Sequence, residues 1–421
     1  MENKIENLKL LNKILIKKLK KIGDNLLKNI NCKNLNKALI KILINSSDLK
    51  SVSIESFFIK EEGKYLSFKN IEKFCSFCNI DSSVFYDILK MYSKNIIPSE
   101  MVKFNIERKV FTGFEFKIYV EKLTQRFSIE PFTIVKYRNV ETSQSYSIGH
   151  RSGIHDKLIK FKEEKYCYLL QKGIVKNIFK TLNFKNYYIC PDVSSLLFHE
   201  ACGHFLEADM LMMPQTPFSL DSKNKVITSE KLNIISENNG KYLGASSFDD
   251  EGTICQSIYL IKNGRIDQYM TDSNLADIVK QSPRGNYRSQ NILEKKPHIR
   301  MTNFIVKNSG TKIYDKFGIF LTDVRKIKVR SNGDFQCIFN GFFYKNVKYN
   351  CDILYADNIK SFLSKIVDIS NDQIPFTGDC YKGTIDGRGE FFTVTNAAPT
   401  IKLSDMNLKI LKNKGDNNNE I

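Results

Sequence analysis

The sequence predicts an α+β protein with several domains, and three observations support this. The chain has 421 residues, whereas single hydrophobic cores stop growing near about 250–300 residues. Residues 103–147 alternate apolar and polar side chains, as β-strands do. Residues 191–209 instead form an apolar segment that is typical of a buried helix. With 42% hydrophobic residues, the composition is that of a globular protein.

Composition and local pattern divide the chain into four predicted segments. These are an N-terminal domain of helical and mixed structure with basic amphipathic helices (1–100), a β-rich middle domain (101–186), a large C-terminal α+β domain (187–410) and a polar, disordered tail (411–421).

Local patterns predict particular helices and turns within these segments. In residues 8–22 apolar side chains recur every three or four positions, which places them on one helical face. Helices are also expected at 35–44 and near 165–180. Asn-Gly pairs at 263–264 and 332–333 predict hairpin turns. The apolar face of the first helix consists of Leu8, Leu11, Leu15, Leu19 and Ile22.

The formal net charge of +18 invites a nucleic-acid function, but its distribution argues against one. Lysine greatly outnumbers arginine and is scattered along the chain, and there is no zinc-finger pattern or arginine-rich block. Twelve lysines against four acidic residues in the first fifty positions make the opening helices basic. These helices either pack on their own domain or bind an acidic partner or membrane surface. We expect the former, with no nucleic-acid ligand.

Cysteine usage and hydropathy predict a cytoplasmic protein. Ten cysteines in 421 residues show no disulfide spacing, so we interpret them as free thiols in a reducing compartment. No uninterrupted apolar run has the length of a signal peptide or of a membrane span. We therefore expect no stable membrane anchoring.

The segment with the clearest chemistry is His-Glu-Ala-Cys-Gly-His, residues 199–204, in the predicted buried helix with Asp192 as its N-cap. Buried polar groups cost free energy unless they are paired or bind a metal. At 3.6 residues per turn, His199 and His204 would lie about 140° apart, so a regular helix would not direct both at one ion. Gly203 makes a local widening or π-bulge tolerable there. The sequence therefore predicts a metal site on an irregular helix.

Two alternatives to this metal site remain open. A structural hydrogen bond between histidine and Glu200 would also account for buried polar residues. Cys202 lies three residues after His199 and is a rival metal ligand, although a buried free cysteine is commonly a small packing residue.

Several blocks of the sequence resemble the TldD/PmbA family of metallopeptidases. They keep their order over about half of the chain, whereas the family's N-terminal region is barely recognisable. The blocks are Leu196–Glu207, Phe248–Thr253, Ile261–Gly264, Tyr269–Asp272, Gly285–Asn286 and Arg300–Asn303.

This resemblance implies a zinc ion held by His199, His204 and a cysteine near the C-terminus, with Glu200 as the general base. The cysteine corresponds to Cys380, where this chain departs from the family because Tyr381 follows it in place of glycine. Catalytic zinc takes three protein ligands and leaves one position for water, and two histidines with a cysteine are a known set.

Four charged residues in the resembling blocks are candidates for contacts to substrate or to the metal ligands. In loops such residues are more often simply solvated. The four are Asp249, Asp250, Arg288 and Arg300.

The resemblance also implies an activity and a partner. The expected function is a zinc-dependent peptidase that hydrolyses small unfolded peptides or peptide precursors. Family members commonly form two-subunit assemblies, so we expect a heterodimer with a homologous non-catalytic subunit, in which this chain is the catalytic member, or a homodimer. The alternative is a non-catalytic, peptide-binding or metal-stabilised subunit of a two-subunit protease complex.

Overall fold

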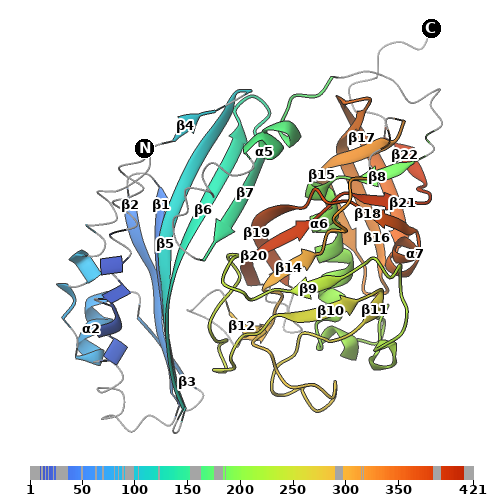
Figure 1. The fold of residues 1–421 in the computed structure, drawn as a ribbon. Helices are drawn as coiled ribbons and strands as arrows, with labels where there is room; N and C mark the ends of the chain where they lie inside the picture. The colour runs from blue at the N-terminus through green and yellow to red at the C-terminus, as the bar shows by residue number, and fades with distance from the viewer. Residues whose placement is uncertain are drawn as a thin grey trace.

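In this computed structural model, the described residues form two seven-stranded sheets, a six-stranded sheet and a two-stranded ribbon (Figure 1). The description runs from residue 10 to residue 411, with gaps at 11–12, 15, 18, 22, 25–36, 49–50, 62–63, 69–70, 80, 84, 88–89, 91–98, 103, 122–123, 152–162, 175–183, 185, 290–296, 314, 316 and 383–389.

The N-terminal sheet contains the strands β1 (Lys37–Asp48), β2 (Ser51–Glu61), β3 (Lys64–Phe68), β4 (Glu100–Met101), β5 (Ile106–Glu121), β6 (Thr124–Asn139) and β7 (Ser145–His150). It is antiparallel, in the order β3-β2-β1-β5-β6-β7, with β4 also paired to β5. Strands from both sides of residue 100 therefore share one sheet. Helix α2 (Ile71–Cys78) contacts β2 and β3. The expected domain boundaries stay predictions.

The alternating pattern of residues 103–147 is confirmed as strand structure by β5, β6 and β7. Strands β5 and β6 pair along their whole length, from Ile106 opposite Asn139 to Glu121 opposite Thr124. Phe114, Phe116 and Ile118 on β5 are buried.

Two predicted helices are corrected by the structure. Residues 35–44 are not helical where they are described, because residues from Lys37 onward form β1, which hydrogen-bonds to β5 on one side and β2 on the other. This stretch is rich in isoleucine, which packs well in strands, and sheet pairing overrides its helical spacing. The helix near 165–180 is the shorter α5 (Glu163–Leu169), and residues 175–183 lie outside the description.

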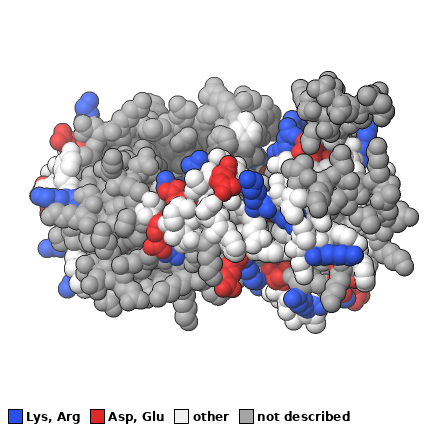
Figure 2. Space-filling view, turned by 90° about the horizontal axis from the view of Figure 1, so that it is seen from above, with Lys and Arg blue, Asp and Glu red and all other residues white. Residues whose placement is uncertain are grey.

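The basic helix predicted at residues 8–22 lies partly outside the described residues. The positions that are described there are helical, and Leu19 is fully buried. Leu8, Leu11, Leu15 and Ile22 lie outside the description. On the face shown in Figure 2, described basic and acidic side chains lie close to one another and form no extended patch of one sign.

The C-terminal part contains two further large sheets with helical segments between and around them. The six-stranded sheet has the order β11-β10-β9-β14-β20-β19 and the seven-stranded sheet the order β18-β21-β8-β15-β16-β17-β22. In chain order, the elements are β8 (Tyr187–Ile189), α6 (Pro191–Phe198), η1 (His199–Gly203), η2 (His204–Leu206), η3 (Met210–Met212), η4 (Leu220–Ser222), β9 (Ile234–Ser236), β10 (Ile258–Lys262), β11 (Arg265–Ile266), β12 (Tyr287–Arg288), β13 (His298–Ile299), β14 (Asn303–Val306), β15 (Ile319–Val329), β16 (Asp334–Tyr344), β17 (Val347–Asn358), α7 (Ile359–Ser364), β18 (Ile366–Ile369), β19 (Ile374–Lys382), β20 (Glu390–Ala398), β21 (Ile401–Leu403) and β22 (Leu408–Ile410).

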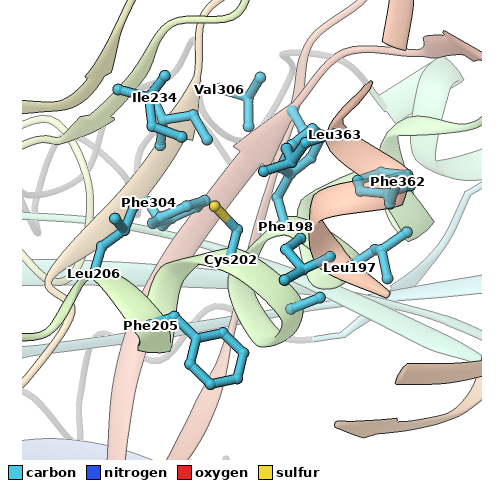
Figure 3. Packing of buried hydrophobic residues seen from close by; sticks show 14 of the residues in the cluster. Leu197, Phe198, Cys202, Phe205, Leu206, Ile234, Phe304, Val306, Phe362 and Leu363 are labelled. Carbon is cyan, nitrogen blue, oxygen red and sulfur yellow. The ribbon is translucent and has the colours of Figure 1, made fainter. Parts of the chain in front are cut away.

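Helix α6 is held between these two sheets, because it contacts β15 of one sheet and β14, β19 and β20 of the other. Figure 3 shows Leu197, Phe198 and Cys202 from this segment beside Phe304 of β14 and Phe362 of α7. All five side chains are at least 99% buried. Such close packing on both sides fixes the helix and any ligand that it carries.

The start of α6 differs from the expected N-cap. Cys190 is the N-cap residue and Pro191 occupies the first helical position, where its missing N–H costs nothing. Asp192 lies inside the first turn and is buried. Its carboxylate accepts hydrogen bonds from Thr322 Oγ1 at 2.9 Å and Asp323 N at 2.8 Å.

The Asn-Gly turns lie where the sequence places them. Asn263 and Gly264 have φ angles of 48° and 71° between β10 and β11, as a two-residue hairpin of type I′ requires. Gly333, with a φ of 87°, lies between β15 and β16. Among the described residues, no helix is long and apolar enough to cross a membrane.

A buried ion pair joins the N-terminal sheet to the C-terminal part. Lys117 Nζ on β5 lies 2.9 Å from Asp250 Oδ1, and the two side chains are 2% and 0% exposed. Lys117 also donates to the backbone oxygen of Phe248 at 2.6 Å. Burial raises the pKa of Asp250, but Lys117 and other groups together have a larger, opposite effect and lower the pKa to about 2. The pair is therefore fully charged at neutral pH.

We predict that Lys117→Met lowers the free energy of unfolding by about 3 kcal/mol, because it leaves a buried carboxylate without its cation. The double variant Lys117→Met/Asp250→Asn should lose less than the sum of the two single variants. Urea unfolding measures this. Lys231→Met, which removes an exposed partner of Asp368, should cost less than about 1 kcal/mol. Equal losses for Lys117→Met and Lys231→Met would contradict the prediction.

Candidate metal centre

The segment of the His-Glu motif is a π-helix from His199 to Gly203 that continues α6. The backbone N–H of His204 donates to the oxygen of His199, five residues earlier. This wider turn brings together two side chains that a regular helix would separate. The two imidazole rings lie 5.0 Å apart between centroids, at an angle of 86°. The structure thus has the irregular helix that the spacing of the histidines predicts.

Gly203 is required by the packing of this turn. Its φ of −60° is ordinary for any residue. A Cβ atom there would lie 2.4 Å from Met301 Sδ and 3.0 Å from Phe304 Cε2. The missing side chain therefore lets the π-helix lie directly on the residues of β14 and the loop before it.

The third residue of the candidate centre arrives on β19, an edge strand of the six-stranded sheet. Cys380 Sγ lies 3.5 Å from His204 Nε2. Ligand atoms of His199, His204 and Cys380 all lie within 4.8 Å of one another. Zinc–nitrogen and zinc–sulfur bonds of roughly 2.1 and 2.3 Å place the ligands of a tetrahedral ion about 3.5 Å apart. The separation of Cys380 Sγ and His204 Nε2 is therefore the one expected of two ligands of a tetrahedral zinc ion, and the three side chains lie close enough together to share one ion.

Glu200 lies beside this triad on the solvent side. Its Oε1 is 3.9 Å from His199 Nε2 and its Oε2 is 4.0 Å from His204 Nε2. The Glu200 side chain is 34% exposed, whereas His199 and Cys380 are 1% and 2% exposed. A water or substrate reaching the triad from this side would therefore meet Glu200.

Each histidine is held by a different partner at its Nδ1 atom. His199 Nδ1 lies 2.8 Å from Asn396 Oδ1, and His204 Nδ1 lies 3.3 Å from Glu207 Oε2. Both partner atoms accept hydrogen bonds, so each Nδ1 carries a proton, and each Nε2 is the nitrogen that can bind a metal once it has lost its own proton. Sequence reasoning missed Asn396 and Glu207. Glu207 could have been found, because it follows His204 by three residues in a helical segment.

The charges of the cluster support one another. Burial raises the pKa of the Cys380 thiol, but His199 and His204 together have a larger, opposite effect and lower the pKa to about 6. Burial lowers the pKa of His204, but Glu207 and Cys380 raise it to about 10. The Glu207 carboxyl has a lowered pKa despite burial, because Lys382 and His204 lie beside it. The cluster therefore holds a thiolate at neutral pH, which is the form that binds metals.

The four charged candidates from the resembling blocks are all buried. Among the described contacts, Arg300 is the candidate that contacts a residue of the triad. Arg300 Nη2 donates to the backbone oxygen of Cys380 at 2.6 Å. Asp249 accepts from the N–H groups of its own loop, Asp250 pairs with Lys117, and Arg288 lies over a ring of β20. Roles for these residues at a substrate stay predictions.

Cys202, the rival ligand, faces away into the apolar core. It is fully buried beside Phe304 (Figure 3), and burial raises its pKa to about 12. A cavity of about 1130 Å³ lies at the other end of α6 and is lined by Cys190 and Pro191 among others, but by no residue of the triad. This cavity is therefore separate from the candidate centre.

Comparison with protein families gives a match over the C-terminal part of the chain. The model of the PmbA/TldA metallopeptidase C-terminal domain matches residues 187–409. This range contains both histidines of the motif and Cys380.

Comparison with individual proteins gives relatives and a structural neighbour. The chain is 29% identical over 229 residues to a zinc metalloprotease TldD homolog of Saccharolobus solfataricus, covering 52% of this chain and 50% of that one. It is 36% identical over 123 residues to a metalloprotease TldD homolog of Buchnera aphidicola, covering 28% and 25%. This chain therefore spans half or less of these curated relatives. The crystal structure of TldE from Thermococcus kodakarensis superposes with a TM-score of 0.58 at 13% identity, covering 94% of this chain and 99% of that one.

We predict that the Cys380 thiolate in chelator-treated, metal-free protein titrates with a midpoint near pH 6. The lowered pKa means that the thiolate persists as the pH falls and is lost only through that value. The ultraviolet absorbance of the thiolate measures this, and Cys380→Ala should remove the transition. A midpoint near the ordinary thiol value of about 8.5 would contradict the charge arrangement.

Proposed function

This chain belongs to the PmbA/TldD family of metallopeptidases, and we propose that it is a zinc-dependent peptidase that hydrolyses small unfolded peptides or peptide precursors. One observation carries the proposal. Two imidazoles and a thiol converge within 4.8 Å, and a partly exposed carboxylate, Glu200, lies about 4 Å from both imidazoles. This is the arrangement that a metal-assisted hydrolase needs.

The chemistry of the donor set favours zinc over calcium and magnesium. His199, His204 and Cys380 offer two nitrogens and one sulfur, whereas calcium and magnesium prefer oxygen ligands. Three protein ligands leave a fourth position open, as in catalytic zinc sites. When bound, zinc supplies Lewis-acid chemistry, which polarises a carbonyl group and makes water more acidic.

Glu200 is the proposed general base. Its carboxylate lies next to the imidazole Nε2 atoms and on the solvent side, where an attacking water arrives. One of its oxygens accepts the proton of that water and then passes it to the nitrogen of the departing amine. Asn396 and Glu207 hold the histidines from behind, so the rings keep their direction while this proton moves.

A second subunit is part of the proposal. The fold covers almost all of a protein titled TldE, and the family resemblance implies two-subunit assemblies. We propose a heterodimer with a homologous subunit that lacks the metal motif, or a homodimer, acting in the cytoplasm, where the Cys380 thiol stays reduced. The competing function is a non-catalytic, peptide-binding or metal-stabilised subunit, in which the largely buried triad binds metal only for stability.

We predict that Glu200→Gln abolishes hydrolysis of unfolded test peptides while bound zinc stays near one equivalent. Gln keeps the size of the side chain but cannot take a proton. Zinc content and peptide cleavage are both measured, with the candidate partner subunit present. His199→Ala and His204→Ala should lose zinc as well as cleavage.

Two outcomes separate the alternatives. Wild-type protein that binds zinc but cleaves no peptide, or Glu200→Gln protein that retains activity, would favour the non-catalytic subunit. Carefully prepared wild-type protein without stoichiometric zinc would overturn the metallopeptidase proposal altogether.

A further inference from the structure

Lys382 is a buried lysine that lies two residues after Cys380 on β19. Residues i and i+2 of a strand point to the same face, so Lys382 is directed to the same end of the motif helix as the thiol. Its side chain is 7% exposed. A buried ammonium is costly unless its donors are all paired.

The ammonium group of Lys382 is fully paired. Its Nζ lies 2.7 Å from Glu207 Oε2 and 2.6 Å from Asp209 Oδ2, and it donates to the backbone oxygen of Ile299 at 2.9 Å. These partners use the three donors that a lysine has. Burial lowers the pKa of Lys382, but Glu207 and Asp209 raise it above its ordinary value, so the group is charged.

The same Glu207 oxygen that binds Lys382 also faces His204. Glu207 Oε2 lies 3.3 Å from His204 Nδ1, and Glu207 Oε1 accepts from Met301 N at 3.1 Å. On the other side of the ring, His204 Nε2 lies 3.5 Å from Cys380 Sγ. Strand β19 therefore reaches both nitrogens of one imidazole: directly through Cys380, and through Glu207 by way of Lys382.

We propose that Lys382 is a positioning residue that assembles the metal centre from its two distant halves. Its ion pairs with Glu207 and Asp209 tie β19 to the end of the motif helix. These ion pairs fix where Cys380 lies relative to His204, and they keep the His204 ring oriented toward the thiol. This inference rests on the proposed metal site, but it concerns how the site is assembled and does not depend on hydrolysis.

The test compares Lys382→Met with Lys348→Met. Lys348 is a matched control, because it is also buried, lies 2.6 Å from Asp323 Oδ2 and donates to the oxygen of Leu169. Titration with zinc gives the dissociation constant, and titration with cobalt gives the thiolate-to-cobalt absorption band. We expect Lys382→Met to weaken zinc binding by roughly 10- to 100-fold and to reduce the cobalt band. Lys348→Met should lower stability and leave both unchanged.

A double variant separates positioning from simple charge balance. Lys382→Met/Asp209→Asn removes the carboxylate at position 209 that has lost its cation but keeps Glu207 beside His204, and it should therefore fold better than Lys382→Met. If Lys382 positions β19, zinc binding stays weak in the double variant. Zinc affinity and a cobalt band equal to wild type in either Lys382 variant would overturn the proposal.

A readout without metal keeps this test independent of the proposed function. Hydrogen exchange of the peptide spanning residues 374–382 in metal-free protein should become severalfold faster in Lys382→Met but not in Lys348→Met. Unchanged exchange would overturn the positioning role even if wild-type protein bound no zinc. Wild-type protein that binds zinc through Cys380 but hydrolyses nothing would overturn the peptidase and leave the role of Lys382 standing.

Discussion

Burial of the polar side chains around the motif helix is the constraint on which the rest of this structure depends. Each group taken from water into the core needs a partner there. Asn396 on β20 supplies one for His199, Glu207 one for His204, and Arg300 binds the backbone of Cys380. Because Asn396 and Cys380 come from strands far along the chain, β19 and β20 of the six-stranded sheet must pack against the motif helix before the cluster is complete.

The motif itself was predictable from sequence because its evidence is local. Two histidines five residues apart, with a glycine before the second, require a widened turn, and the structure has a π-helix there. The distant supporting residues, Asn396 and Lys382, were not predictable in this way. Glu207 and Lys382 are 175 positions apart along the chain, and an isolated lysine in a lysine-rich sequence gives no signal.

The same reasoning explains the errors in the N-terminal half. Parts of residues 106–139 alternate apolar and polar side chains, as Phe-Glu-Phe-Lys-Ile does at 114–118, and this local pattern favours a strand without help from elsewhere. Residues 35–44 carry isoleucine, leucine and lysine at spacings that suit either a helix or a strand. Pairing with β5 decides between them, and β5 is far away in the sequence. The buried ion pair between Lys117 and Asp250 also joins residues far apart in the sequence, so no local pattern predicts it.

The separation of the ligands also orders events during the synthesis of the protein. His204 and Cys380 are 176 residues apart along the chain. A ribosome that has made the motif helix has therefore not yet made the thiol that faces it. Strand β19 can join the sheet only after residues 205–379 have been made. A nascent chain that ends before Cys380 therefore lacks one of the three side chains of the candidate centre, whatever metal it meets.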